Sequence, residues 1–195
     1  EAVATFAGED NKPATYTASI VTWPGSGIKS LADIKSRSFA YSDPSSTSGH
    51  LFPAYGLSKN GIDPDHGVKA IYAGSHTASF EALRNHKVQA GELNSEEIAS
   101  AKLHNEFDPN AYVTLWQSEP IPLDPIAVRG NLPAEFKQRL AKILSSLDFH
   151  ELPEADQKFL AANENPALRT TVQNDAAYDQ IRDLVKTLHV DLAKL

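Results

Sequence analysis

Short strand-like runs and helix-like segments alternate along this chain from residue 15 to residue 129. β-branched and aromatic residues fill 15–23 and stop at Pro24-Gly25, which ends the first expected strand. Later apolar runs predict further strands at 38–41, 68–72, 88–93, 112–116 and 126–129. Because strands that alternate with helices form a parallel or mixed sheet with helices on both faces, the pattern predicts an α/β fold.

Helical spacing of apolar residues predicts helices between the strands, at 30–34, 47–60, 77–84 and 96–103. Pro53 lies inside the second of these, where it removes a backbone hydrogen bond and is expected to kink the helix. Asn60-Gly61 ends that helix. Beyond Pro133 the chain is mostly helical, with apolar faces over 136–147 and 178–188.

The composition excludes several classes of protein. The chain has 195 residues, with 18 Lys+Arg against 25 Asp+Glu, a formal net charge of −7, and neither Cys nor Met. An acidic chain without a basic stripe matches neither nucleic acid nor an anionic membrane surface. Without Cys there is no disulfide, thiolate zinc site or cysteine nucleophile, and no apolar run approaches the ~18 residues of a membrane span. Because translation starts with Met and this chain starts at Glu1, we expect a processed product or an excised piece.

Three polar loops occupy the same position in this pattern, each after a strand and before a helix. The first, Ser46-Thr47-Ser48-Gly49, offers hydroxyls and unpaired backbone N–H groups to an anion, and Gly49 would let a ligand approach the backbone closely. The second loop contains His76, a candidate donor to an anionic oxygen. The third places Glu96 in the first turn of the next helix. Ligands of α/β sheets bind beyond the carboxyl ends of the strands, where such loops lie.

Asp124 is a fourth polar feature, between prolines that hold an extended segment and would aim the carboxylate into a cleft. Each feature alone also has an ordinary explanation, as a helix cap, a surface histidine, an acidic first turn or a solvated turn residue. Together they describe oxyanion donors and two carboxylates in one site. A zwitterionic ligand would satisfy both.

Ordered motifs carry these residues: DPSSTSG at 43–49, AGSH at 73–76 with SFEAL at 79–83, VQAG at 88–91 with NSE at 94–96, and PIPLDP at 120–125. They resemble the phosphonate-binding periplasmic subunits of ABC importers, and the resemblance runs from about Thr5 to beyond Arg129. It implies a type II periplasmic-binding-protein fold, which has two lobes, a mixed sheet and flanking helices. It also implies a non-enzymatic solute-binding protein for phosphonate transport, located in the periplasm, with an ABC importer permease as partner and no cofactor.

By position, the resemblance assigns the phosphonate oxygens to four residues, Ser46, Thr47, Ser48 and His76. It assigns the ligand ammonium to Glu96 and Asp124. A desolvated ammonium needs paired carboxylates, whereas unpaired carboxylates beside a dianion would repel it. The presence of both acids therefore favours 2-aminoethylphosphonate or a similar aminoalkylphosphonate.

The resemblance also implies how the chain divides. Residues 17–118 would form a complete second lobe with the anion site, while 1–16 and 119–195 would supply the crossover strands and C-terminal helices of the first lobe. Family members begin with several βα units that this chain does not contain, so we expect the first lobe to lack its N-terminal part. Its apolar faces must then be covered by a separate fragment, a second copy of the chain or a rearrangement. We therefore expect a proteolytic or engineered piece, or a homo-oligomer.

Two alternatives stay open. The first keeps the binding function but changes the ligand to phosphite, phosphate or another small oxyanion, or makes the domain part of a sensor. The second is a hydrolase in which Ser46 or Ser48 acts with His76 and Asp124, although no nucleophile elbow with Gly on both sides of a Ser is present. No metal site is expected, because no His or Asp pair has ligand spacing on one element.

Overall fold

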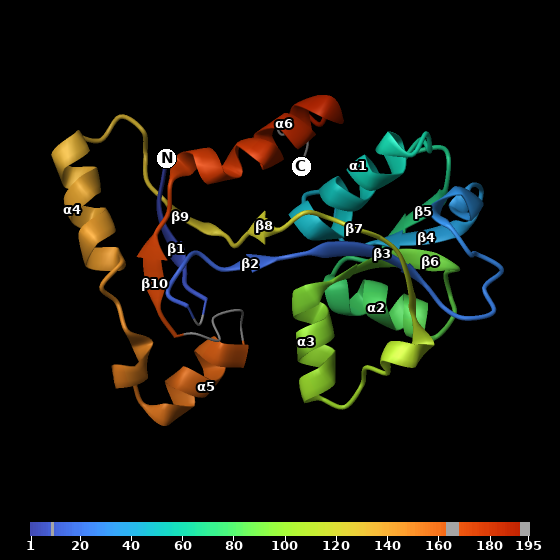
Figure 1. Ribbon diagram of the computed structural model, residues 1–195, viewed down its shortest axis with the longest axis horizontal. Coiled ribbons are helices and arrows are strands. Elements are labelled where there is room, and N and C mark those ends of the chain that lie inside the picture. The colour runs from blue at the N-terminus through green and yellow to red at the C-terminus, as the bar shows by residue number, and fades with distance from the viewer. Residues whose placement is uncertain (9, 163–167, 192–195) are drawn as a thin grey trace. The chain divides into compact units, whose positions relative to one another are not determined.

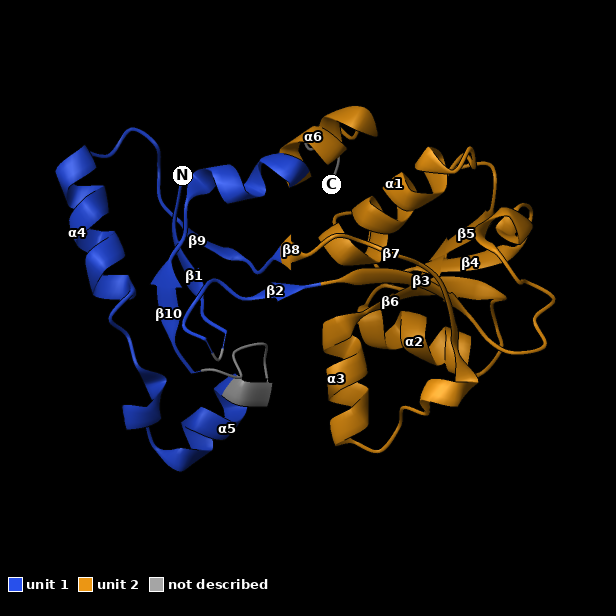
Figure 2. Ribbon diagram, viewed as in Figure 1, with its two compact units in different colours: residues 1–16, 122–180 blue, residues 17–121, 181–195 orange. Residues whose placement is uncertain are grey.

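The computed structural model describes residues 1–8, 10–162 and 168–191 of the 195 (Figure 1). The chain forms two compact units (Figure 2). Unit 1 contains residues 1–16 and 122–180, and unit 2 contains residues 17–121 and those from 181 onward. From the sequence we expect one lobe formed by residues 17–118 and the other formed by residues 1–16 and 119–195. The structure differs mainly after residue 180, because its division falls inside one continuous helix, α6 (Asp179–Thr187).

Unit 2 is built on a five-stranded sheet in the order β5-β4-β6-β3-β7. The strands are β3 (Ala18–Thr22), β4 (Ser38–Tyr41), β5 (Lys69–Tyr72), β6 (Ala90–Asn94) and β7 (Val113–Gln117). β4 runs parallel to β5 and β6, whereas β3 runs antiparallel to β6 and β7. The α/β class and the mixed sheet are therefore confirmed. The run expected at 15–23 divides into β2 (Thr15–Tyr16), which pairs with β8 (Ile121–Pro122), and β3.

Helices cover both faces of the unit 2 sheet, with α1 on one face and α2 and α3 on the other (Figure 1). Alternation along β4 supplies both cores. Phe39 and Tyr41 join Leu57 of α1 in one buried cluster, whereas Ala40 joins Phe80 of α2 in the other. The helices are α1 (Phe52–Lys59), α2 (His76–Arg84) and α3 (Ser95–Leu103). None of the helices in the described part of the chain is long and apolar enough to cross a membrane.

The helix expected at 47–60 does not begin as an α-helix. Thr47–Leu51 form a π-helical turn, in which the backbone N–H of Leu51 bonds to the carbonyl of Ser46 at 3.0 Å. α1 starts at Phe52, so Pro53 lies in its first turn, where a missing N–H is tolerated. The kink expected inside the helix at Pro53 is therefore replaced by a change from π to α geometry just before it.

Unit 1 carries a three-stranded antiparallel sheet in the order β10-β1-β9. The helix expected from the apolar face at 136–147 is present as α4, which contacts β1 and β10. The sequence analysis does not predict β1 or β10, and the strands that pair with them lie far away along the chain. The elements of unit 1 are β1 (Ala2–Phe6), β9 (Pro125–Ala127), α4 (Ala134–Leu144), α5 (Glu154–Ala162), β10 (Thr170–Val172) and the start of α6.

Candidate functional site

Residues 46–49, here called the hydroxyl turn, follow β4 and open the π-helical segment of unit 2. Ser46 Oγ caps the turn by accepting a hydrogen bond from the Gly49 N–H at 3.0 Å. Ser48 is buried, and its Oγ accepts from Asn94 Nδ2 at 3.1 Å. Since the first N–H groups of a helix have no partner inside it, a turn that adds hydroxyls to them is suited to an oxyanion.

Packing within the protein by itself requires glycine at position 49. A Cβ on Gly49 would lie 1.7 Å from Ser42 Oγ and 2.8 Å from His76 Cε1. These two side chains fill the space on the Cβ side of Gly49, and close approach of a ligand to its backbone stays a prediction. The absence of a Cβ lets the His76 ring pack against the hydroxyl turn.

His76 links the hydroxyl turn to the neighbouring strand β6. It is the first residue of α2, whose N-cap Ser75 accepts a hydrogen bond from the Ala78 N–H at 3.1 Å. Its Nε2 atom lies 3.2 Å from Ser46 Oγ, and its Nδ1 atom lies 3.1 Å from Glu92 Oε2. The His76 side chain is 30% exposed, whereas that of Glu92 is 1% exposed. The imidazole therefore stands between hydroxyls and a buried carboxylate.

The charge of His76 is set by burial and by nearby carboxylates. Burial lowers the pKa of His76, but the hydrogen bond and charge of Glu92 outweigh this effect, so the pKa is raised above its ordinary value. Glu97 and Glu96, in the first turn of α3, act in the same direction. Burial raises the pKa of Glu92, and His76 opposes that rise. A raised pKa keeps positive charge on His76 to higher pH, which favours an anion beside it.

Asn94 connects the hydroxyl turn to α3. It ends β6 and caps α3, since its Oδ1 accepts from the Glu97 N–H at 2.7 Å while its Nδ2 donates to Ser48. Glu96 follows in the first turn of α3 and is half-buried. Because β4, β5 and β6 are parallel, the three polar loops after them lie at the same edge of the sheet.

Asp124 belongs to unit 1, where it lies between β8 and β9. The residue is exposed, and its carbonyl oxygen accepts a hydrogen bond from Thr5 Oγ1 at 2.9 Å. The hydroxyl of Tyr178 donates to the neighbouring Leu123 carbonyl at 2.8 Å, so the backbone of this extended segment is held in place. The role of Asp124 toward a ligand stays a prediction.

Two residues of the unit 2 cluster are missing from the sequence prediction of the site, Glu92 and Asn94. A signal for Glu92 exists in the sequence, because a carboxylate within a strand that is covered on both faces must be buried and paired. Asn94 carries no such signal, since an Asn before a helix reads as a simple N-cap. Its second contact, to Ser48, depends on the alignment of β6 beside β4.

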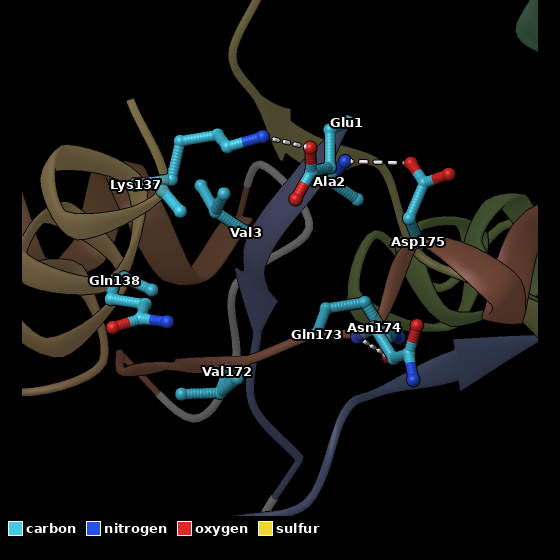
Figure 3. A pocket seen from close by; sticks show the side chains of 11 residues that line it. Glu1, Ala2, Val3, Lys137, Gln138, Val172, Gln173, Asn174 and Asp175 are labelled. Atoms are coloured by element: carbon cyan, nitrogen blue, oxygen red, sulfur yellow. Dashed lines mark hydrogen bonds and ion pairs between the residues drawn. The ribbon is translucent and has the colours of Figure 1, made fainter. Parts of the chain in front are cut away.

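Unit 1 contains a cavity of about 300 Å³ between the start of β1, α4 and the residues that follow β10 (Figure 3). Lys137 pairs with Glu1 there, and Asp175 Oδ1 accepts from the Ala2 N–H at 2.7 Å. None of the six predicted ligand residues lines this cavity. It is therefore separate from the predicted site.

Comparison with known families decides between the classes of protein that this geometry allows. The model of a family described as "ABC transporter, phosphonate, periplasmic substrate-binding protein" matches residues 1–184. The chain belongs to this family. Members of the phosphonate-binding family are substrate-binding proteins, which supports a binding protein rather than an enzyme.

The names of two similar proteins are consistent with membership of the phosphonate-binding family. The phosphonates-binding periplasmic protein of Escherichia coli (strain K12) is 31% identical over 136 residues, which cover 67% of this chain and 40% of that protein. The probable ABC transporter phosphite binding protein of Prochlorococcus marinus (strain MIT 9301) is 31% identical over 125 residues, which cover 63% of this chain and 42% of that protein. The chain therefore spans less than half the length of these two relatives.

A solved structure shows the same fold. The crystal structure of a binding protein component of an ABC phosphonate transporter from Pseudomonas aeruginosa has a TM-score of 0.73 and 27% sequence identity. The match covers 96% of this chain and 62% of that one. The periplasmic-binding-protein fold expected from the sequence is thereby confirmed.

Proposed function

We propose that this chain is the ligand-binding part of a solute-binding protein that captures a phosphonate for ABC import. The observation that carries the proposal is the cluster in which the hydroxyl turn, His76 and Asn94 are joined by hydrogen bonds at one edge of the sheet. The hydroxyls, the helix start and an imidazolium supply donors, and a phosphonate offers several anionic oxygens. Ser46, Thr47, Ser48 and His76 are the proposed phosphonate ligands.

A net charge of −7 does not prevent the capture of an anion. Hydrogen bonds at the hydroxyl turn act at contact distance, whereas charges beyond about 8 Å are largely screened at physiological salt. Thr47 and Ser48 would add neutral donors, and the imidazolium form of His76, which its raised pKa favours, would add a local positive charge. The local donors rather than the net charge therefore decide what this site attracts.

For the ligand, we propose an aminoalkylphosphonate such as 2-aminoethylphosphonate, whose ammonium Glu96 and Asp124 would hold. Glu96 is half-buried, and it lies close enough to His76 to raise the pKa of the imidazole. Carboxylates beside a dianion repel it unless the ligand brings a positive charge of its own. Glu96 thus favours an amine-bearing ligand, while the role of Asp124 rests on the sequence pattern.

Phosphite is the main alternative ligand, because the Prochlorococcus marinus relative is named as a phosphite binding protein. Phosphite and phosphate would use the same donors of the hydroxyl turn, and so would a sensor domain for small oxyanions. Phosphite and phosphate have no ammonium group that Glu96 and Asp124 could bind. The affinities for ligands with and without an amine therefore separate these alternatives.

Titration calorimetry with 2-aminoethylphosphonate, methylphosphonate, phosphite and phosphate tests the proposed function. We expect 2-aminoethylphosphonate to bind most tightly and Ser48→Ala to weaken binding of all four ligands. Ser58→Ala removes an exposed hydroxyl from α1 and should change none of the affinities. Tighter binding of phosphite than of 2-aminoethylphosphonate would contradict the amine assignment, and equal effects of the two variants would contradict the site.

The geometry also bears on the hydrolase alternative. Ser46, His76 and Glu92 lie in hydrogen-bonding order, as in a Ser-His-acid triad, with Glu92 at the ring nitrogen that the hydrolase alternative gives to Asp124. Ser46 Oγ is, however, the N-cap of the turn, and the family consists of substrate-binding proteins. Turnover of a phosphonate ester that is lost in His76→Ala would favour hydrolysis over capture.

We also propose that unit 2 is the lobe that carries the anion site and that unit 1 is part of the other lobe. The location would be the periplasm and the partner an importer permease, since the Escherichia coli relative is named as a periplasmic phosphonates-binding protein. Capture would use charge-assisted hydrogen bonds, with no covalent step.

A further inference from the structure

A buried carboxylate that the proposed function does not use lies behind His76. Glu92, in the middle of β6, is 1% exposed, and its two carboxylate oxygens lie 3.1 and 3.2 Å from His76 Nδ1. When Glu92 is ionised, its carboxylate can only accept hydrogen bonds, so Nδ1 then carries the proton of this contact. Glu92 therefore holds one proton of the imidazole on the side away from the hydroxyl turn.

Hydrogen bonds on the Nε2 side of the His76 ring are consistent with a proton on Nδ1. The Gly49 N–H donates to Ser46 Oγ at 3.0 Å, and Ser46 Oγ lies 3.2 Å from His76 Nε2. When His76 is neutral, Nε2 has only a lone pair, so the Ser46 hydroxyl donates to it and the ring offers no donor to a ligand. A proton on Nε2 reverses this bond and releases the Ser46 hydroxyl hydrogen for a ligand oxygen.

We propose that Glu92 is a positioning residue that keeps the proton of neutral His76 on Nδ1. His76 can then donate a hydrogen bond from Nε2 only when it is an imidazolium. The site therefore takes up a proton when it binds a dianionic ligand. This inference rests on the proposed oxyanion site. One proton from solvent therefore supplies the ligand with one further donor, either His76 Nε2–H itself or the Ser46 hydroxyl that Nε2–H releases by donating to Ser46 Oγ. No bond to the ligand forms or breaks except the hydrogen bonds, and the added proton stays on Nε2 or on the ligand oxygen that faces it.

Carboxylates on two elements face His76 and act on its charge. Glu92 lies on β6, and Glu96 and Glu97 lie in the first turn of α3. All three favour the imidazolium, whereas Ser46 on the hydroxyl turn is uncharged. The Thr77 hydroxyl donates to Glu97 Oε2 at 3.3 Å, while Glu92 has the direct contact with the ring. Glu92 is therefore the residue whose replacement should move the proton balance most.

Nitrogen-15 NMR of the ligand-free chain tests the proton positions without any ligand. A His76→Gln variant identifies the His76 signals among the seven histidines. We expect the neutral ring to carry its proton on Nδ1, and Glu92→Gln to shift the His76 titration to lower pH, whereas Glu81→Gln on α2 should not shift it. A neutral ring protonated on Nε2 in the unaltered chain would overturn the proposal, and so would a titration that Glu92→Gln leaves unmoved.

Calorimetry with methylphosphonate in two buffers of different ionisation enthalpy measures the proton uptake on binding. Above the pKa of His76 and the second ionisation of the ligand, we expect uptake of close to one proton and a loss of about tenfold in affinity per pH unit. His76→Gln keeps an N–H donor and should take up far less. Equal uptake in His76→Gln would overturn the proposal, because the proton would then belong to the ligand alone. Absence of binding would contradict the proposed function instead, and the NMR result would still decide the role of Glu92.

Discussion

Gly49 allows the hydroxyl turn and His76 to pack together, and its replacement tests that contact. In Gly49→Ala the new Cβ would lie 1.7 Å from Ser42 Oγ, so we expect a loss of roughly 1–3 kcal/mol in the free energy of unfolding. Gly130→Ala is the matched control, because a Cβ there meets nothing within 4 Å. Urea unfolding of both variants provides the comparison. Equal stability of the two would contradict this packing.

Thr47 and Ser48 are proposed to donate to the anionic group that all phosphonates share. Replacement of either by Ala should weaken methylphosphonate and 2-aminoethylphosphonate alike, by roughly 1–3 kcal/mol for a lost buried donor. Ser48→Ala should have the larger effect of the two, since it also removes the acceptor of Asn94 Nδ2. Titration calorimetry measures both changes. A loss confined to the amine-bearing ligand would contradict the assignment.

Asp124 is predicted to act on the opposite end of the ligand. Asp124→Asn keeps the size of the side chain but removes its charge, so 2-aminoethylphosphonate should bind less tightly while methylphosphonate binds unchanged. The same two titrations distinguish this result from that of Thr47→Ala. An equal loss for methylphosphonate would exclude the ammonium role.

At the scale of elements, two histidines next to the hydroxyl turn should respond to pH in opposite directions. Burial lowers the pKa of His50, whose Nδ1–H donates to the Pro44 carbonyl at 2.8 Å while the Tyr72 hydroxyl lies 3.0 Å from its Nε2. His50 therefore contributes fully to stability above pH 6.5, which is about the pKa of His in the unfolded chain. This contribution is lost as the pH falls below that value. The raised pKa of His76 gives a contribution that is complete below about pH 6.5 and is lost as the pH rises.

Unfolding free energies across pH 5 to 8 measure these two contributions. The advantage of the unaltered chain over His50→Gln should shrink as the pH falls, and its advantage over His76→Gln should shrink as the pH rises. Both variants remove a titrating ring and keep an amide that can form hydrogen bonds. Changes of the same sign in the two variants would contradict the opposite environments of the two rings.

The elements also show what a sequence can predict here. β4, β5 and β6 follow from local runs of apolar residues, and the position of Ser46, Ser48 and His76 after those strands follows from the order of elements. The π-helical turn does not follow, because its geometry depends on how Gly49 packs against side chains from other segments. β1 pairs with β10 and β9, which lie more than 100 residues away along the chain, and a reading of local runs does not show such pairing.

At the scale of the whole molecule, exposed apolar side chains on α4 predict association. Phe136 is 52% exposed and Ile143 is 51% exposed. Stable soluble monomers rarely expose large apolar patches, so the sequence prediction of a second copy or a covering fragment stays open to test. Sedimentation over a range of concentrations should show dimers that Phe136→Ser with Ile143→Ser dissociates. A monomer at every concentration would contradict this prediction.

The central claim is that the hydroxyl turn of unit 2 holds the oxyanion. A crystal structure with 2-aminoethylphosphonate tests it most directly. We predict density for a tetrahedral group within hydrogen-bonding distance of Ser46, Thr47, Ser48 and His76 Nε2. A phosphonate bound in the unit 1 cavity, or anywhere away from the hydroxyl turn, would contradict the claim.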